Sequence, residues 1–150
     1  MHGRSGPIVS TVNDREPNMT LVEQLNTVPI PLAKLLGIEI IEAEKERVSG
    51  CMVVREDLCT AGRILHGGAM MALADTLGAI GAFLNLPQDT GTATLESKTN
   101  FLGSVKAGRT IKAEAVPLHL GRRTSVWQTR ISDEDGRLVG IVTQTQMTMG

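Results

Sequence analysis

The chain has 150 residues, 41% hydrophobic and 21% charged, which is enough for one globular domain with a core of its own. Its formal net charge of -1 provides no overall attraction to nucleic acid or to an anionic membrane, so we expect neither as a partner. No signal-peptide pattern opens the chain, and Cys51 and Cys59 are expected as reduced thiols rather than a disulfide, which together predict a cytoplasmic protein.

The N-terminal part predicts a flexible arm followed by two short helices. Residues 1–19 mix Gly, Pro, Ser, Asn and Asp with little periodicity, so we expect an arm there and a single domain over residues 20–150. From Leu21 to Leu36 the apolar residues recur near helical spacing, interrupted by Pro29 and Pro31. This pattern predicts two helical pieces that end at Gly37.

Most of the remaining chain has the period of two that is typical of strands. The first two strands are expected over residues 38–41 and 47–55. Four further runs, rich in Thr, Val and Ile and separated by turn residues, cover residues 91–102, 109–120, 122–132 and 138–149. Such consecutive hairpins predict an antiparallel meander. Pro117 within 109–120 indicates an edge or a bulge at that point.

Between the two groups of strands lies an almost wholly apolar helix. It is expected from Ala69 to Leu86, where Pro87 prevents its continuation, and its only ionisable side chain is that of Asp75. Asp75 and several glycines argue against a transmembrane span. Because this helix cannot face water, the sequence predicts an α+β domain in which an antiparallel sheet wraps one helix.

Two stripes of residues run along this helix. One is bulky and suited to packing on a sheet, and consists of Leu73, Leu77, Ile80 and Leu84. The other is small except for one acid, and consists of Gly68, Ala72, Asp75, Ala79 and Ala82. A close neighbour is therefore expected on the small side, either a partner subunit or a thin ligand. Asp75 is either catalytic there or a structural carboxylate with satisfied donors.

His66-Gly67-Gly68 stands where this helix begins. Glycines at the N-terminus of a helix, here called the helix mouth, let a ligand oxygen approach free backbone N–H groups. The helix dipole adds positive potential there, so the helix mouth could polarise a carbonyl. The alternative is an ordinary glycine turn with His66 as a polar cap. A carboxylate two turns further along the same segment favours the chemical interpretation.

These residues resemble a known family. The segments Leu65-His66-Gly67-Gly68, Ala72-Leu73-Ala74-Asp75, 94–102 and 117–128 are similar to the hotdog-fold acyl-CoA thioesterases of the phenylacetate-pathway and 4-hydroxybenzoyl-CoA thioesterase type. The resemblance runs from about residue 32 to residue 149. It implies one long central helix wrapped by an antiparallel sheet of about five to six strands. It also implies a homodimer, or a dimer-of-dimers homotetramer, with active sites at the dimer interface.

The resemblance also implies roles for individual residues. The Gly67 N–H would polarise the thioester carbonyl, with His66 shaping that corner and Gly68 binding substrate, and Asp75 would act as nucleophile or general base. In some relatives a Ser or Thr positions water near the acid, either one helical turn after it or on the strand that begins the meander. This chain has Ala79 at the first position and Thr94 at the second, so Thr94 is expected to position water, contributed by the partner subunit. Thr60 stands where relatives often have Asn or Gln, and is expected to contact substrate.

Basic residues fit a phosphorylated substrate. Between Lys98 and Arg130 seven Lys and Arg residues stand against one acid, Glu114. Arg122 and Arg123 in the family-like segment are the preferred contacts of the coenzyme A phosphates, and Gly121 and His119 of the same segment are also expected to bind substrate.

We therefore expect hydrolysis of an acyl- or aroyl-CoA to free acid and coenzyme A without cofactor or metal. Methionines near the helix mouth, Met70 and Met71, predict an adaptable apolar pocket and a broad range of acyl groups. The alternatives are a non-catalytic acyl-CoA-binding hotdog domain and a hotdog hydratase or dehydratase. An acid at Asp75 argues against the first, and the Leu-Ala-Asp context argues against the second.

Overall fold

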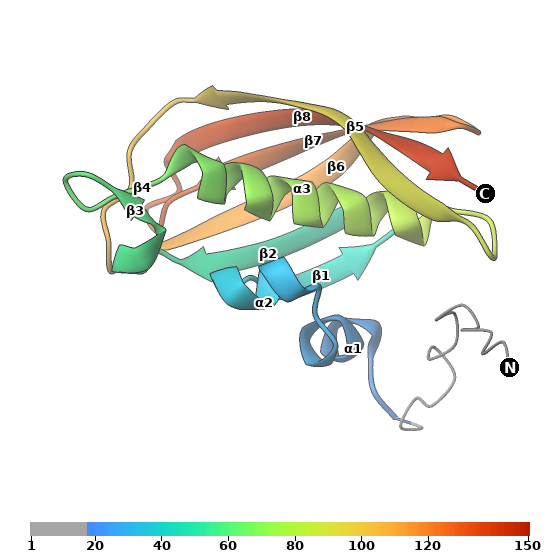
Figure 1. Cartoon of the computed structure of the whole chain (residues 1–150), viewed down its shortest axis with the longest axis horizontal. Helices are drawn as coiled ribbons and strands as arrows, with labels where there is room; N and C mark the ends of the chain where they lie inside the picture. The colour runs from blue at the N-terminus through green and yellow to red at the C-terminus, as the bar shows by residue number, and fades with distance from the viewer. Residues whose placement is uncertain (1–17) are drawn as a thin grey trace, which may run out of the picture.

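The structure, a computed structural model, describes residues 18–150, so most of the arm expected over 1–19 lies outside the described residues (Figure 1). One long helix, α3 (Gly67–Leu84), lies across a six-stranded sheet with the strand order β1-β2-β6-β7-β8-β5. All neighbouring strands in this sheet are antiparallel. The predicted α+β architecture, with one helix wrapped by a single antiparallel sheet, is confirmed.

The six strands match the predicted ranges to within a few residues at each end. Their bounds are β1 Glu39–Glu44, β2 Arg47–Val53, β5 Gly91–Phe101, β6 Thr110–Leu120, β7 Thr124–Ser132 and β8 Leu138–Met149. Pro117 lies beyond Ala115, the last residue of β6 that pairs with β2, and the pairing of β6 with β7 shifts register between Pro117 and His119. The bulge expected at Pro117 is therefore present, and the missing N–H breaks no ladder with β2.

The N-terminal helices also agree with the prediction. α1 (Leu21–Thr27) begins at a capping box between Thr20 and Glu23, and α2 (Pro31–Leu36) ends at Gly37, which has a φ of 71°. The Asn26 side chain exchanges two hydrogen bonds of 2.8 Å with the Ile40 backbone and so fastens α1 to β1.

A short 3₁₀ turn (η1, Glu56–Leu58) and a small hairpin of β3 (Cys59–Thr60) and β4 (Ile64–Leu65) stand where a loop was expected. Two-residue strands are too short to show a period of two, which is why the sequence does not reveal them. Cys51 and Cys59 are free thiols, as predicted.

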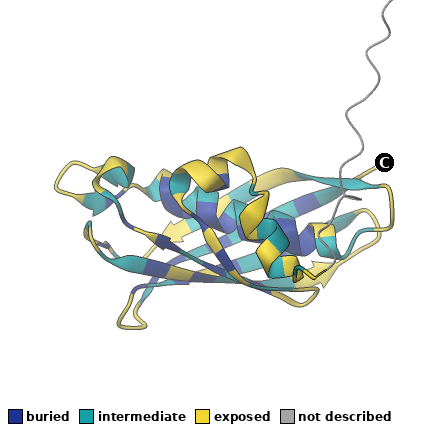
Figure 2. Ribbon diagram, turned by 90° about the horizontal axis from the view of Figure 1, so that it is seen from below, coloured by how far each residue is buried: buried dark blue, intermediate teal, exposed yellow. Residues whose placement is uncertain are grey.

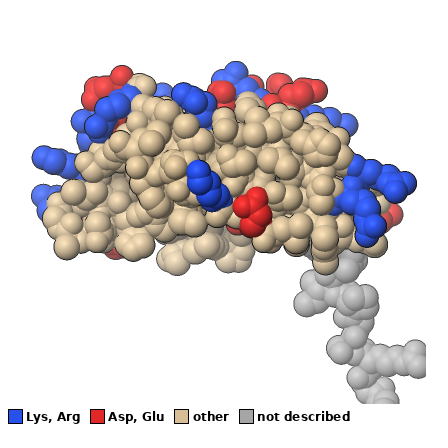
Figure 3. Space-filling model, turned by 90° about the horizontal axis from the view of Figure 1, so that it is seen from above, with Lys and Arg blue, Asp and Glu red and all other residues tan. Residues whose placement is uncertain are grey.

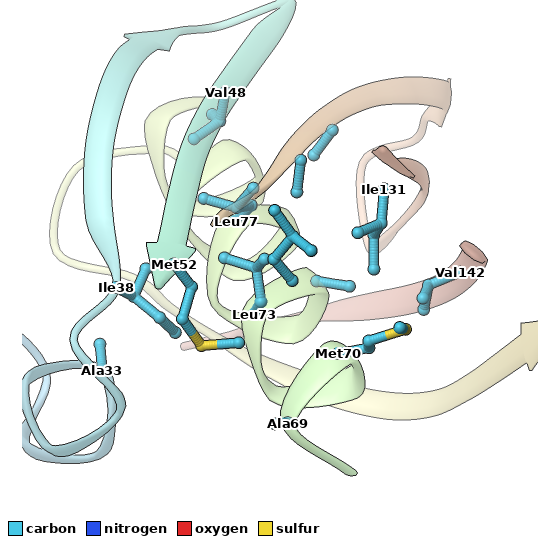
Figure 4. Close-up of a cluster of buried hydrophobic side chains, with 14 of the residues drawn as sticks. Ala33, Ile38, Val48, Met52, Ala69, Met70, Leu73, Leu77, Ile131 and Val142 are labelled. Carbon is cyan, nitrogen blue, oxygen red and sulfur yellow. The ribbon is translucent and has the colours of Figure 1, made fainter. Parts of the chain in front are cut away.

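The core lies between α3 and the sheet (Figures 2 and 4). Leu73 and Leu77 are completely buried, and Ile80 is 8% exposed, so the bulky stripe packs on the strands as expected. By length and composition α3 could also cross a membrane, but half of it is buried inside this fold as the core helix.

Two glycines of α3 let large side chains of the sheet come close to the helix backbone. A β-carbon on Gly78 would lie 2.5 Å from Cδ of Gln144, and one on Gly81 would lie 2.5 Å from the ring of the fully buried Trp127. Along the small stripe expected to meet a close neighbour, Gly68 is exposed, Ala72, Asp75 and Ala79 are half-buried, and Ala82 is buried. Within one chain, therefore, the tight contact involves a different helix face from the one expected.

Replacement of Gly81 by alanine tests this contact. Alanine raises helix propensity by about 1 kcal/mol, whereas overpacking a rigid core costs about 1–3 kcal/mol. Because the Trp127 ring is buried and has nowhere to move, we expect Gly81→Ala to lower the free energy of unfolding by about 1 kcal/mol or more in urea titrations. Gly91→Ala is the control, because a β-carbon there meets nothing within 4 Å. A Gly81→Ala protein as stable as the parent would contradict the assigned contact.

Candidate active site

The carboxylate of Asp75, midway along α3, is held by two side chains from the sheet. Thr94 Oγ on β5 donates to Asp75 Oδ1 at 2.7 Å, and Gln144 Nε2 on β8 donates to the same oxygen at 3.2 Å. A half-buried acid in an apolar helix is thereby supplied with donors, as buried polar groups generally are. Both donors belong to the same chain as Asp75. The expectation that Thr94 comes from the partner subunit is therefore corrected, because β5 runs alongside α3 of its own chain.

The other oxygen of this carboxylate is free. Asp75 Oδ2 accepts no hydrogen bond from the described residues, and it is absent from the buried polar atoms that lack a partner, so solvent reaches it. The Asp75 carboxylate therefore has one oxygen fixed by the protein and one available to a ligand or to water.

Two further side chains continue the hydrogen bonding behind Thr94. Gln146 Nε2 donates to Thr94 Oγ at 2.7 Å, and Thr92 Oγ donates to Gln146 Oε1 at 3.0 Å. Gln144 and Gln146 are 0% and 1% exposed. Sequence reasoning missed all three of Thr92, Gln144 and Gln146. The available signal was the alternation of Val142, Gln144 and Gln146 in one strand, which places two glutamines on the same face as a core valine.

At the helix mouth, His66 is a polar cap and one backbone N–H group is still free to bind a ligand. His66 is the N-cap, and its Nδ1 accepts the Gly68 N–H at 2.8 Å, so His66 is a polar cap and the Gly68 donor is occupied. The Gly67 N–H has no acceptor among the described residues and stays available. Gly67 also serves packing, because a β-carbon there would lie 2.8 Å from the Phe101 ring.

Gly67 and Asp75 of one chain are too far apart to act on one carbonyl. Eight residues of α-helix separate them by about 12 Å along the axis, whereas groups that contact the same carbonyl lie within about 3 Å of it. The joint action expected from these two residues on one segment is therefore impossible within a single chain. Action of both groups on one carbonyl would need the N-terminus of one helix and the acid of another.

The expected phosphate contacts lie at the opposite end of α3 from this mouth. A cavity of about 310 Å³ is lined by Ala82, Asn85, Leu86, Pro87, Leu120, Gly121, Arg122, Ser125 and Thr148. Gly121 and Arg122 thus meet at one cavity. Arg123 instead accepts the Thr148 N–H through its carbonyl at 2.8 Å, and His119 packs against Gly121. Thr60 is exposed on β3 and makes no side-chain hydrogen bond with the described residues.

Comparison with known proteins identifies the family of this chain. Residues 62–140 match the family model described as the Thioesterase superfamily. The chain belongs to this superfamily. ComA2 of Bacillus subtilis, which carries the name of an esterase, is 45% identical over 112 residues, covering 73% of this chain and 87% of its own.

A 1,4-dihydroxy-2-naphthoyl-CoA hydrolase of Listeria monocytogenes is 34% identical over 110 residues, covering 73% of this chain and 89% of its own. Among solved structures, the E. coli PaaI protein from the phenylacetic acid degradation operon has a TM-score of 0.78 at 25% identity, covering 86% of this chain and 91% of that one.

This membership confirms the family inferred from the sequence motifs and identifies the chain as a hotdog-fold thioester hydrolase. In this thioesterase the His66 to Asp75 segment forms the first half of the central helix, inside the matched region.

Proposed function

We propose that this thioesterase hydrolyses an acyl- or aroyl-CoA through Oδ2 of Asp75, without metal or cofactor. The observation that carries the proposal is that the two oxygens of one carboxylate differ in their hydrogen bonding. Oδ1 accepts hydrogen bonds from two side chains, whereas Oδ2 accepts none from the described residues and is open to solvent. Asp75 holds the only ionisable side chain of α3, and an oxygen atom free of protein donors is what a base or a nucleophile requires.

Two routes lead from this arrangement to the same products. As a general base, Oδ2 takes a proton from water, the water oxygen bonds to the thioester carbon, and the carbon–sulfur bond breaks to release coenzyme A as its thiol. As a nucleophile, Oδ2 itself bonds to that carbon while the carbon–sulfur bond breaks and coenzyme A leaves as its thiolate. Water then cleaves the mixed anhydride, which restores the Asp75 carboxylate, releases the free acid and supplies the proton that the thiolate takes up. Thr60, near the mouth in sequence, and Gly68 are proposed to line the substrate site.

We assign carbonyl polarisation to Gly67 of a second copy, with His66 of that copy shaping the same corner. Support comes from the separation of about 12 Å along the helix, which is too long for both groups of one chain to contact the same carbonyl, and from the Gly67 N–H, which has no acceptor among the described residues. A two-fold axis would place each helix mouth beside the other chain's Asp75 and so create two equivalent sites.

The edge strand β5 supports such a dimer. It lies at the end of the sheet, and Leu95, Phe101 and Leu102 are each 54% exposed on it or just after it. Figure 3 shows the face over β5, where charged side chains are sparse in the middle and gather toward the rims. Because an open apolar edge invites pairing with another strand, we propose a homodimer joined along β5, or a dimer-of-dimers tetramer that contains it.

The cavity at Arg122 supports the site proposed for the coenzyme A phosphates. Asp75, Ala79 and Ala82 follow one another on one helix face and lead to this cavity, about 10 Å from the acid along the axis. Small side chains leave room for the thin pantetheine arm on this path. Free cysteines and a coenzyme A substrate fit a reducing compartment, so we propose a cytoplasmic location.

Asp75→Asn tests the role of the acid. Asparagine keeps the size of the side chain but is neither basic nor nucleophilic, so turnover should fall by about 100-fold or more while acyl-CoA binding persists. Thiol release is measured on short-chain, long-chain and aromatic acyl-CoA esters, among which we expect broad tolerance. Parent-like turnover by Asp75→Asn would favour a structural carboxylate, and absence of thiol release by the parent would favour a binding domain.

Complementation between two inactive chains tests the shared site. Gly67→Pro removes the N–H at the first helix position, where proline suits the backbone, and should be inactive by itself, like Asp75→Asn. Its ring also displaces the Phe101 side chain, so the control is Gly67→Ala, which displaces Phe101 in the same way but keeps the N–H and should stay active. In a heterodimer of Gly67→Pro and Asp75→Asn, one site combines both defects and the other combines intact Gly67 with intact Asp75. We expect such heterodimers, purified through two different tags, to recover about half of the parent activity. Heterodimers as inactive as the two homodimers would contradict a site built from two chains.

Substitution of the paired arginines tests the phosphate site. We expect Arg122→Ala with Arg123→Ala to raise KM for acyl-CoA by about tenfold and to leave kcat nearly unchanged, since only charge-assisted contacts far from the reacting carbon are lost. The effect should shrink when the acyl thioester of a truncated pantetheine without phosphates is used. An unchanged KM for acyl-CoA would place the phosphates elsewhere.

A further inference from the structure

A directed chain of hydrogen bonds ends on Asp75. It runs from Thr92 Oγ to Gln146 Oε1 at 3.0 Å, from Gln146 Nε2 to Thr94 Oγ at 2.7 Å, and from Thr94 Oγ to Asp75 Oδ1 at 2.7 Å. Three of its members lie on the neighbouring strands β5 and β8, where Thr94 pairs with Gln146 in register.

The chemistry of the groups fixes the direction of this chain. A carboxylate only accepts, so a distance of 2.7 Å between Thr94 Oγ and Asp75 Oδ1 requires the single hydroxyl proton of Thr94 to lie between them. Thr94 then has only lone pairs left for Gln146, and the amide must present its NH₂ end to Thr94. Its oxygen end consequently faces the Thr92 hydroxyl. No other orientation of the Gln146 amide satisfies all three contacts.

Gln144 is oriented by the same logic. Its Nε2 lies 3.2 Å from Oδ1 and 3.4 Å from the backbone carbonyl of Asp75, and both of these atoms are acceptors. Its Oε1 is buried with no partner among the described residues. The side chain fits against α3 because Gly78 carries no β-carbon, so the groove at Gly78 brings the amide to the carboxylate.

Burying the two amide groups of Gln144 and Gln146 costs desolvation free energy. Leucine or methionine would occupy a similar volume without the desolvation cost, and the unpaired Oε1 of Gln144 adds a further one. The two amides instead fix the orientation of the carboxylate. Gln144 donates to Oδ1 directly, and Gln146 donates to Thr94, which is the second donor to Oδ1 among the described residues. A purely structural role leaves this convergence unexplained.

We infer that Gln146 and Gln144 are positioning residues that turn the Asp75 carboxylate so that Oδ2, and not Oδ1, meets the thioester. This inference rests on the proposed catalytic role of Asp75. Thr94, whose proton is already donated to Asp75, does not donate to substrate, and Gln146 acts only through Thr94. Thr92 completes the chain by holding the oxygen end of the Gln146 amide.

A double-mutant cycle on kcat tests the inference. Gln146→Met keeps the length of the side chain without its donor, and Thr94→Val replaces the hydroxyl by a methyl group. Each single change should lower kcat about tenfold with KM for acyl-CoA nearly constant, because placement rather than binding is lost. Since Gln146 acts through Thr94, the double variant should have the same kcat as Thr94→Val alone. Thr94→Ser, which restores the hydroxyl, should recover kcat to within about twofold of the parent.

Gln128→Met is the matched control for the substitution itself. Gln128 lies on β7 between the buried Trp127 and Thr129, so it faces the other side of the sheet, and no side-chain hydrogen bond is formed by it within the described chain. We expect parent kcat. If Gln146→Met does not fold, as judged by circular dichroism and thermal unfolding, the cycle is run with Thr92→Val, which should lower kcat about threefold in the parent and not at all in Thr94→Val.

Two results would overturn the inference. Losses in kcat that multiply in the double variant would mean that Gln146 and Thr94 act independently. Parent-like kcat in Thr94→Val would mean that turnover does not depend on the Oδ1 donor that Gln146 orients. Failure of the proposed function looks different, because the parent would then release no thiol or Asp75→Asn would turn over normally. An additive cycle in an active, Asp75-dependent enzyme refutes the positioning role alone.

Discussion

The close packing of α3 on the sheet is the constraint on which the rest of the structure depends. A helix with so few polar side chains must be covered, and two large side chains of the sheet lie against it where Gly78 and Gly81 lack β-carbons. Gly81 admits the Trp127 ring, the largest fully buried side chain. Gly78 admits Gln144. The same contact therefore builds the core at one glycine and the polar surroundings of the acid at the other.

Asp75 is stable in this setting because the core beside it is not wholly apolar. Thr94 and Gln144 reach it from β5 and β8, which are adjacent strands, and Gln146 and Thr92 extend the hydrogen bonding behind them. A carboxylate with both oxygens bound by protein would be a structural feature. A carboxylate with one oxygen bound and one open can act as a base or a nucleophile. The donors on the sheet offset part of the cost of desolvating it.

The rise of the α-helix separates the two groups of the proposed site within one chain. The free N–H of Gly67 and the open oxygen of Asp75 belong to one helix yet stand about 12 Å apart along it. A neighbouring chain across the exposed β5 edge would bring complementary halves together. The stripe of Gly68, Ala72, Asp75 and Ala79, which residues 18–150 of the same chain do not cover completely, is the surface that a second copy and a thin ligand would share in the proposed dimer.

Much of this protein follows from its sequence alone. The order of the strands along the chain, the two N-terminal helices, the buried helix with its single acid, the free cysteines and the thioesterase membership all come from local periodicity, turn residues and motifs, and the structure and the comparisons agree with them. Local signals suffice here because each depends on residues a few positions apart. The lone Asp75 also marks the centre of the proposed site from sequence alone.

Tertiary structure decided what lies around that acid. A period of two shows that Gln144 and Gln146 share a face, but it does not show that this face meets α3, nor that β8 neighbours β5 in the sheet. The origin of Thr94 in the same chain, the choice between Oδ1 and Oδ2, and the cavity joining Arg122 to Ala82 depend on contacts between residues far apart in sequence. Such contacts are set by how strands pair and pack, and no local pattern records them.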